Sequence, residues 1–274
     1  MRTPWIERFL RLARLGFVVA LAGCSTPSIE DEENLGRRAV AEVRQNVLVL
    51  HDDVVESYVD AIGQALVHGA GPQPYEYTFT VVQDAELNAF ATFGGNIFVH
   101  TGMILRVRNV SELAGVLGHE IGHVVHRHMA DNYRRAQQAG LLRNAAVIGS
   151  AIGGINPGAV DLLTQFGTLG LLNTFTREAE TQADEFAVEL LPRAGYDPEG
   201  IVSMFETLTA SNQRRPPKFF SSHPASQDRT KATKALIAAR TLPPDLKRDD
   251  NGKLEIIQHR VRLLTRQDDP ARRR

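Results

Sequence analysis

The sequence has 274 residues, of which 43% are hydrophobic and 23% are charged, and this composition excludes a disordered or fibrous chain. The 31 Lys and Arg residues nearly balance the 32 Asp and Glu residues, so no basic excess predicts a nucleic-acid partner. A single cysteine excludes an internal disulfide.

The first residues have the layout of a bacterial export signal. Several arginines precede an apolar run from Leu15 to Ala22, which is too short to span a bilayer. The run ends in Leu21-Ala22-Gly23-Cys24, which resembles a lipobox, where cleavage precedes a cysteine that receives a diacylglycerol. We therefore expect residues 1–23 to be a lipoprotein signal peptide and Cys24 to be lipidated. An unmodified signal or a core segment is the alternative.

Residues 24–33 are polar and acidic, and we expect a flexible tether there. Two segments with apolar residues at helical spacing follow, at 35–49 and 54–66, before glycines and a proline at 69–72 break the pattern.

Two further segments predict a small sheet. Residues 75–82 alternate and are rich in aromatic and β-branched side chains, and residues 97–100 follow the Gly94-Gly95 turn. A helix is then predicted from Ser111 to about Val125.

The segment 139–172 is apolar and rich in glycine, and it predicts either a mobile lid or a pair of core helices. A membrane hairpin is disfavoured because Asn156, Pro157 and Asp161 interrupt the apolar run. A helix is predicted at 175–191 and a shorter one after Pro198, while residues 241–274 are expected to form a charged tail.

His119, Glu120 and His123 form an H-E-x-x-H motif within the predicted helix. Histidines four residues apart lie on one face of a helix, so both imidazoles can bind one metal ion. Glu120 projects beside them, where its carboxylate can take a proton from a metal-activated water. The motif therefore predicts a zinc hydrolase.

Glu180 and Asp184 are four residues apart on the next long predicted helix. A catalytic zinc needs three protein ligands and an open position, and Glu180 completes a His, His, Glu set. Asp184 is placed to accept the other ring N–H of a ligating histidine. Without the upstream motif, these carboxylates read as a solvated acidic face.

The other histidines are weaker candidates. His126 and His128 follow the motif closely and are alternative ligands, but three imidazoles along one helix would crowd a tetrahedral site, so we expect surface or structural roles. His223 precedes Pro224, which fixes the backbone of a loop that can aim the imidazole inward.

Together these stretches resemble the gluzincin zinc metallopeptidases, the family that includes HtpX, the CaaX prenyl proteases, the mitochondrial Oma-type proteases and the periplasmic BepA and LoiP proteases. The matching stretches are residues 88–91, 94–99 with 101–102, 119–123, 177–184 and 222–224. Two departures are Thr176-Arg177 in place of Ser-Arg and Gln182-Ala183-Asp184 in place of Glu-Ala-Asp. The chain is most similar to the short lipoprotein branch.

The resemblance implies one Zn²⁺ per chain held by His119, His123 and Glu180, with Glu120 as the general base and Asp184 in support. It also implies that an extended peptide docks on an edge strand at residues 96–99, and an edge strand does offer unpaired backbone groups. The residues of that expected strand are Asn96, Ile97, Phe98 and Val99. For His223 it leaves two roles open, a latch on the zinc or a stabiliser of the oxyanion.

We therefore expect an α+β, mainly helical zincin-like domain at residues 34–240. The expected activity is hydrolysis of polypeptide substrates, misfolded or unassembled envelope proteins by analogy, with no nucleic-acid partner. The lipid would hold the protein at the periplasmic face of the outer membrane, which Ser25 after the cysteine favours. The alternative is a latent zinc-bound protein that acts as a chaperone-like binding module. A structural or metal-storing role is disfavoured, since structural zinc prefers a cysteine-rich shell.

Overall fold

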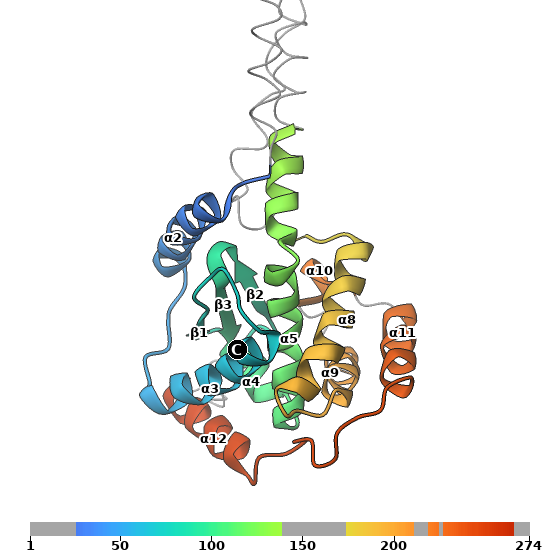
Figure 1. Ribbon diagram of the computed structural model, residues 1–274. Helices are drawn as coiled ribbons and strands as arrows, with labels where there is room; N and C mark the ends of the chain where they lie inside the picture. Colours follow the sequence, from blue (N-terminus) through green and yellow to red (C-terminus); the bar gives the residue numbers. More distant parts are fainter. Residues whose placement is uncertain (1–25, 139–173, 211–218, 225–226, 266–274) are drawn as a thin grey trace, which may run out of the picture.

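The computed structural model describes residues 26–138, 174–210, 219–224 and 227–265 (Figure 1). The elements of the first half are α2 (Ile29–Asn46), α3 (Asp53–Ala70), β1 (Thr78–Val82), β2 (Ala89–Thr92), the 3-10 turn η1 (Phe93–Gly95), β3 (Asn96–His100), α4 (Thr101–Arg106) and α5 (Val110–Val125). Those of the second half are α8 (Arg177–Arg193), α9 (Glu199–Thr209), α10 (Phe219–Ser222), α11 (Gln227–Ala238) and α12 (Lys253–Thr265). The expected mainly helical fold with a small sheet is confirmed.

The signal peptide, Cys24 and the segment 139–172 lie outside the described residues. Among the helices that are described, none combines the length and apolar character needed to cross a bilayer.

The sheet has the order β1-β3-β2, with β3 parallel to β1 and antiparallel to β2. The expectation that residues 96–99 form an edge strand is therefore wrong, because β3 is hydrogen-bonded on both sides. Gly94 and Gly95 adopt φ of 71° and 79°, values that favour glycine, and they turn the chain back from β2 into β3. Among the described strands, β2 has no strand partner on its side toward α5, and we call this side its free edge, although Ala89 and Ala91 on it are buried.

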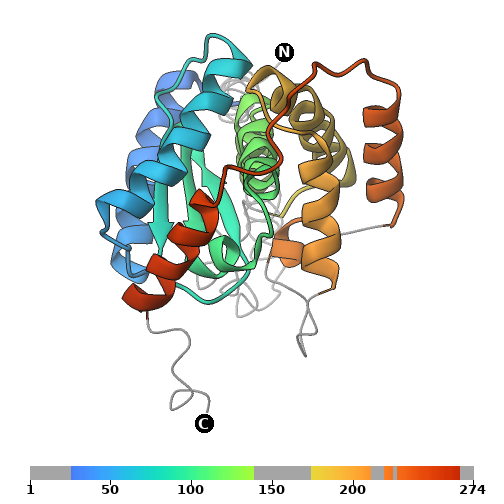
Figure 2. The same ribbon diagram turned by 90° about the horizontal axis from the view of Figure 1, so that it is seen from below.

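Helix α5 lies in the middle of the molecule, with the sheet on one side and α8 and α9 on the other (Figures 1 and 2). Gly122 permits the close contact with α8, since a Cβ there would lie 3.0 Å from the Cα of Ala183. The two helices that carry the expected zinc residues therefore pack directly against each other.

Helix α2 covers the opposite face of the sheet, where Val43 packs against Val82 and Phe98. It begins inside the segment expected to be a tether, and Glu32 in its first turn is buried. The expectation of a flexible tether is therefore wrong for residues 29–33. Glu32 pairs with Arg127 in the turn that follows α5, and Arg127 also donates to the backbone oxygen of Pro27.

The expected charged tail is wrong for residues 253–265, which form α12 and pack against α3 and α4. Leu254, Ile257 and Val261 are buried, and the amide of Gln258 donates to the backbone oxygens of Ile104 and Val107. The charged residues lie on the outer face of this amphipathic helix. Because they alternate with the buried apolar residues in the sequence, the segment resembles a charged tail.

Candidate metal centre

The two motif histidines lie on one face of α5. The helix is capped by Asn109, whose Oδ1 accepts a hydrogen bond from the backbone N–H of Glu112. His119 and His123 are completely buried, and their Nε2 atoms are 3.1 Å apart. As the helical spacing predicts, both side chains present a ring nitrogen to one place, with the rings nearly perpendicular at 79°.

Helix α8 brings the carboxylate of Glu180 to the same place. Thr176 caps this helix by accepting from the backbone N–H of Ala179, so Glu180 falls in its first turns. One carboxylate oxygen lies 3.5 Å from His119 Nε2 and the other lies 3.5 Å from His123 Nε2.

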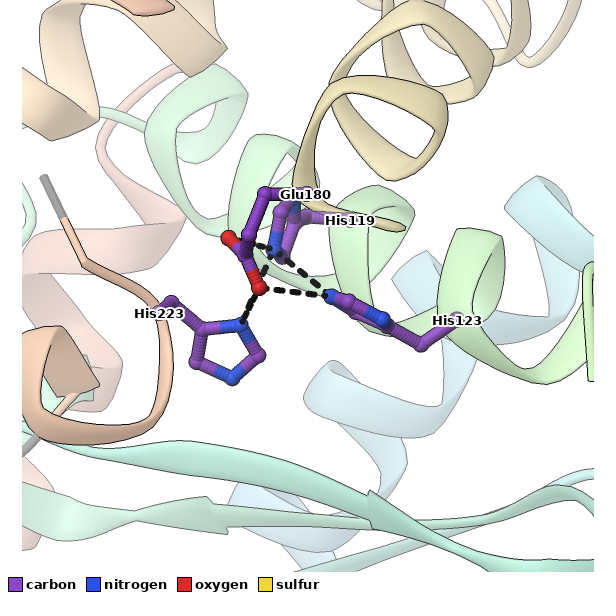
Figure 3. A group of neighbouring side chains, drawn as sticks. All are labelled: His119, His123, Glu180 and His223. Atoms are coloured by element: carbon purple, nitrogen blue, oxygen red, sulfur yellow. Dashed lines mark hydrogen bonds and ion pairs between the residues drawn. The ribbon is translucent and has the colours of Figure 1, made fainter. Parts of the chain in front are cut away.

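His223 is the fourth member of the cluster (Figure 3). It follows α10, and its backbone N–H donates to the oxygen of Phe219. Its Nδ1 lies 3.2 Å from His119 Nε2 and 3.0 Å from Glu180 Oε1. Ligand atoms of all four side chains lie within 4.8 Å of one another, and all four side chains are buried.

Aromatic rings pack against the histidines. Phe175 stacks on His123 with ring centroids 3.8 Å apart, and its centroid lies 5.4 Å from that of His223. Phe219 stacks on His223 with ring centroids 4.5 Å apart. His223 therefore contacts two phenylalanine rings that come from different segments.

Asp184 and Arg229 form a charged pair behind His119. Asp184 Oδ1 lies 2.9 Å from His119 Nδ1, as the sequence predicts. Arg229 makes two hydrogen bonds of 2.8 Å to the Asp184 carboxylate and contacts Glu180 at 2.6 Å. Its Nη1 also donates to the backbone oxygen of Pro224. Arg229 was not predicted, because a single arginine after the His-Pro pair has no pattern of its own.

His123 has a different neighbour. Its Nδ1 lies 2.9 Å from Nδ1 of His128, whose Nε2 lies 2.9 Å from Oε1 of Gln182. Neither His126 nor His128 belongs to the four-residue cluster. In the sequence, the one indication of this contact is that His128 follows the proposed ligand His123 by five residues.

Glu120 is buried and faces both the cluster and the sheet. Its Oε2 accepts a hydrogen bond of 3.0 Å from the backbone N–H of Ala91 in β2, and its Oε1 lies 3.4 Å from His223 Nε2. Burial raises the pKa of this carboxyl group above its ordinary value.

The electrostatics favour charged carboxylates beside the histidines. Burial opposes ionisation of Glu180 and Asp184, but hydrogen bonds from histidines, and from Arg229 to Asp184, outweigh it and lower both pKa values. Burial also lowers the pKa of His119, yet its hydrogen bonds to Asp184 and Glu180 raise it to about 9. For His123 burial dominates, and its pKa lies well below the ordinary value.

This donor set fits a zinc ion. Oδ1 of Asp184 lies 2.9 Å from Nδ1 of His119, which favours a proton on that nitrogen, and Nε2 of His119 lies 3.1 Å from Nε2 of His123. Two ring nitrogens at this distance share either a proton or a metal ion, and the buried Glu180 carboxylate beside them supplies the negative charge that favours a cation there. Neutral imidazoles with a carboxylate are the ligands that zinc prefers at catalytic sites.

Comparison with known proteins identifies relatives of this chain. The model of peptidase family M48 matches residues 54–237. The beta-barrel assembly-enhancing protease of Escherichia coli is 31% identical over 212 residues, which are 75% of this chain and 43% of that protein. The metalloproteases LoiP and YcaL of E. coli are both 32% identical over 65% of this chain, covering 69% and 68% of their own lengths. The chain spans less than half the length of the assembly-enhancing proteases that it matches.

Proposed function

The chain belongs to peptidase family M48, and we propose that it is a zinc metalloendopeptidase in which His119, His123 and Glu180 hold the metal. One observation carries the proposal. Glu120 has one carboxylate oxygen near the donor set and the other on the free-edged strand β2. A metal centre, a general base and a strand edge thus meet at one point, as hydrolysis of an extended peptide requires.

The residues have separate tasks in this mechanism. When bound, the zinc ion supplies Lewis acidity, which polarises a carbonyl group and lowers the pKa of water. Glu120 takes a proton from the attacking water on Oε1 and then donates it to the leaving amine. Oε2 stays hydrogen-bonded to Ala91, which fixes the position of the carboxylate.

The substrate strand would pair with β2 rather than with residues 96–99. His100 donates to the oxygen of Asn88, so the backbone groups of even-numbered residues in this strand face β3. The N–H of Ala89 and the backbone oxygens of Ala89 and Ala91 therefore face the free edge, while the N–H of Ala91 is occupied by Glu120. An extended peptide there would lie beside Glu120, and recognition through backbone groups would depend little on its side chains.

His223 is proposed as a latch in the resting enzyme. Its Nδ1 lies within the donor set, at the distances from His119 and Glu180 given above. An imidazole in the fourth ligand position excludes the water that hydrolysis consumes. Opening would free the ring, which then remains close enough to stabilise an oxyanion.

The cell envelope is the proposed location. The lipobox-like sequence before Cys24 supports a lipid anchor, and Ser25 favours the periplasmic face of the outer membrane. One relative is named a beta-barrel assembly-enhancing protease, and by analogy with its link to assembly we propose misfolded or unassembled envelope proteins as substrates.

The test compares the full-length protein with its Glu120→Gln variant for zinc content and for cleavage of casein. A glutamine oxygen can still accept from Ala91, while the amide cannot take a proton. We expect one zinc per chain in both proteins and cleavage only by the wild type. Zinc in both with cleavage in neither, even after His223→Ala, would support the latent binding protein. Equal cleavage by both would refute the assignment of Glu120.

A further inference from the structure

The two proposed zinc ligands His119 and His123 each have a second ring nitrogen, Nδ1, that faces away from the metal site, and the two Nδ1 atoms contact different kinds of group. Nδ1 of His119 faces the carboxylate of Asp184, which can only accept a hydrogen bond. Nδ1 of His123 faces Nδ1 of His128 at 2.9 Å, and an imidazole nitrogen can either donate or accept. The tautomer of His123 therefore depends on that of His128.

Only one placement of protons along the contacts from His123 to His128 and Gln182 leaves His123 able to bind a metal. Its Nε2, which points into the cluster, must carry a lone pair, so its proton must lie on Nδ1. Nδ1 of His128 must then accept, which places the proton of His128 on Nε2. That proton faces Oε1 of Gln182 at 2.9 Å, and an amide oxygen accepts it.

We propose that His128 is a positioning residue that fixes the tautomer and the ring orientation of His123, with Gln182 fixing His128 in turn. This inference rests on the proposed role of His123 as a zinc ligand. Metal-ligating histidines commonly have an acceptor for their second nitrogen, and an imidazole takes that place here. Because Gln182 is exposed whereas His128 is buried, the larger share of the effect belongs to His128.

The backbone around His128 supports this assignment. In a continuous helix, residues five positions apart point about 140° away from each other, so His128 would turn away from His123. Helix α5 instead ends at Val125, and Arg127 adopts φ of 55°, a left-handed conformation that is uncommon for arginine. This turn brings the ring of His128 back to His123. Arg127 is held in place by buried Glu32 and by Pro27.

A merely structural role for His128 would predict different consequences. His126 provides the comparison, because its ring stacks on that of His128 with centroids 5.5 Å apart, yet it has no polar contact with a proposed ligand among the described residues. If His128 only fills space, leucine, which has a similar volume, should preserve zinc binding better than the smaller asparagine. If it supplies an acceptor, asparagine should restore much of the binding, since its oxygen can occupy the position of Nδ1.

The experiment measures zinc affinity by chelator competition in the full-length wild type, His128→Leu, His128→Asn and His126→Leu. We expect His128→Leu to bind zinc about 10- to 100-fold more weakly, as is usual when such a partner is lost. We expect His128→Asn to recover most of that loss and His126→Leu to bind within about 3-fold of the wild type. Zinc binding by His128→Asn that is no tighter than that by His128→Leu, or wild-type affinity in His128→Leu, would overturn the proposal.

A second measurement remains informative where a His128 variant fails to fold. Long-range ¹H–¹⁵N correlation spectra of the zinc-free wild type and of Gln182→Leu, a change at an exposed position, report which nitrogen of His123 carries the proton. We expect Nδ1–H in the wild type and a mixture of tautomers in Gln182→Leu. An Nε2–H tautomer in the wild type would refute the inference. Because this readout requires no catalysis, its failure leaves the peptidase assignment untouched, and that assignment is tested separately by Glu120→Gln.

Discussion

The backbone N–H of Ala91 in strand β2 donates a 3.0 Å hydrogen bond to Oε2 of Glu120 in helix α5. This bond joins the strand with the free edge to the residue proposed to move the proton. A peptide paired with β2 would therefore be held at a fixed offset from the carboxylate, whatever its side chains. The position of the scissile bond is set by backbone geometry.

Shortening this carboxylate should separate its two contacts. In Glu120→Asp the side chain loses one methylene, so it cannot both accept from Ala91 and reach the donor set. We expect kcat to fall by about 10²-fold or more, with KM and zinc content nearly unchanged. Steady-state kinetics on a quenched fluorescent peptide measure this. Wild-type kcat in the aspartate variant would contradict the proposed geometry.

Removing Arg229 should weaken both the metal site and the fold. In Arg229→Met the carboxylates of Glu180 and Asp184 lose a buried cation, and breaking such a pair costs about 3–5 kcal/mol. We expect a lower free energy of unfolding in urea and a lower zinc affinity. Arg229→Lys keeps the charge but not the two parallel hydrogen bonds, so its losses should be intermediate. A methionine variant as stable as the wild type would show that the pair contributes nothing.

Releasing His223 should activate the enzyme. In His223→Ala the imidazole leaves the donor set, and we expect a higher initial rate of casein cleavage with zinc still bound. Ser222→Ala is the matched control, because this neighbouring hydroxyl contacts only the oxygen of Phe219 among the residues described. A fall in kcat of about 10²-fold in His223→Ala would instead assign His223 to the oxyanion.

Lipidation should decide where the protein is found. Cys24→Ser removes the only thiol of the chain, so no lipid can be attached there. We expect the wild type in the outer-membrane fraction and the variant in the soluble periplasmic fraction after cell disruption. Persistence of Cys24→Ser in the membrane fraction would argue against the anchor. Cleavage of casein by the purified variant should remain at the wild-type level.

The donor set was accessible from sequence because its spacing is local. Helical periodicity places His119 and His123 on one face of α5. The same four-residue spacing places Glu180 and Asp184 on one face of α8. The burial of all four side chains and their short distances agree with that prediction. The helices at 35–49, 54–66 and 175–191 were likewise predicted from regular apolar spacing.

The contacts made by Arg229, His128 and Ala91 depend on how separate elements pack, and no periodicity encodes them. Strand β2 has only four residues, three of them alanine or phenylalanine, and so short a segment shows no alternation that predicts a strand. The family resemblance implies a free edge at residues 96–99, and the pairing of β2 with β3 occupies that edge. The left-handed turn at Arg127 also has no sequence signal, since arginine rarely adopts it.

The hydrogen bond from Arg127 to the backbone oxygen of Pro27 limits how far the enzyme can lie from a lipid anchor. Pro27 is fixed to the end of α5, and it follows Cys24 by three residues. An extended chain covers at most about 3.5 Å per residue, so a lipid on Cys24 would keep that end of the helix within about 10 Å of its attachment point. Such an enzyme would stay close to the membrane and would not extend across the periplasm. Its substrates would be limited to polypeptides that lie near the bilayer surface.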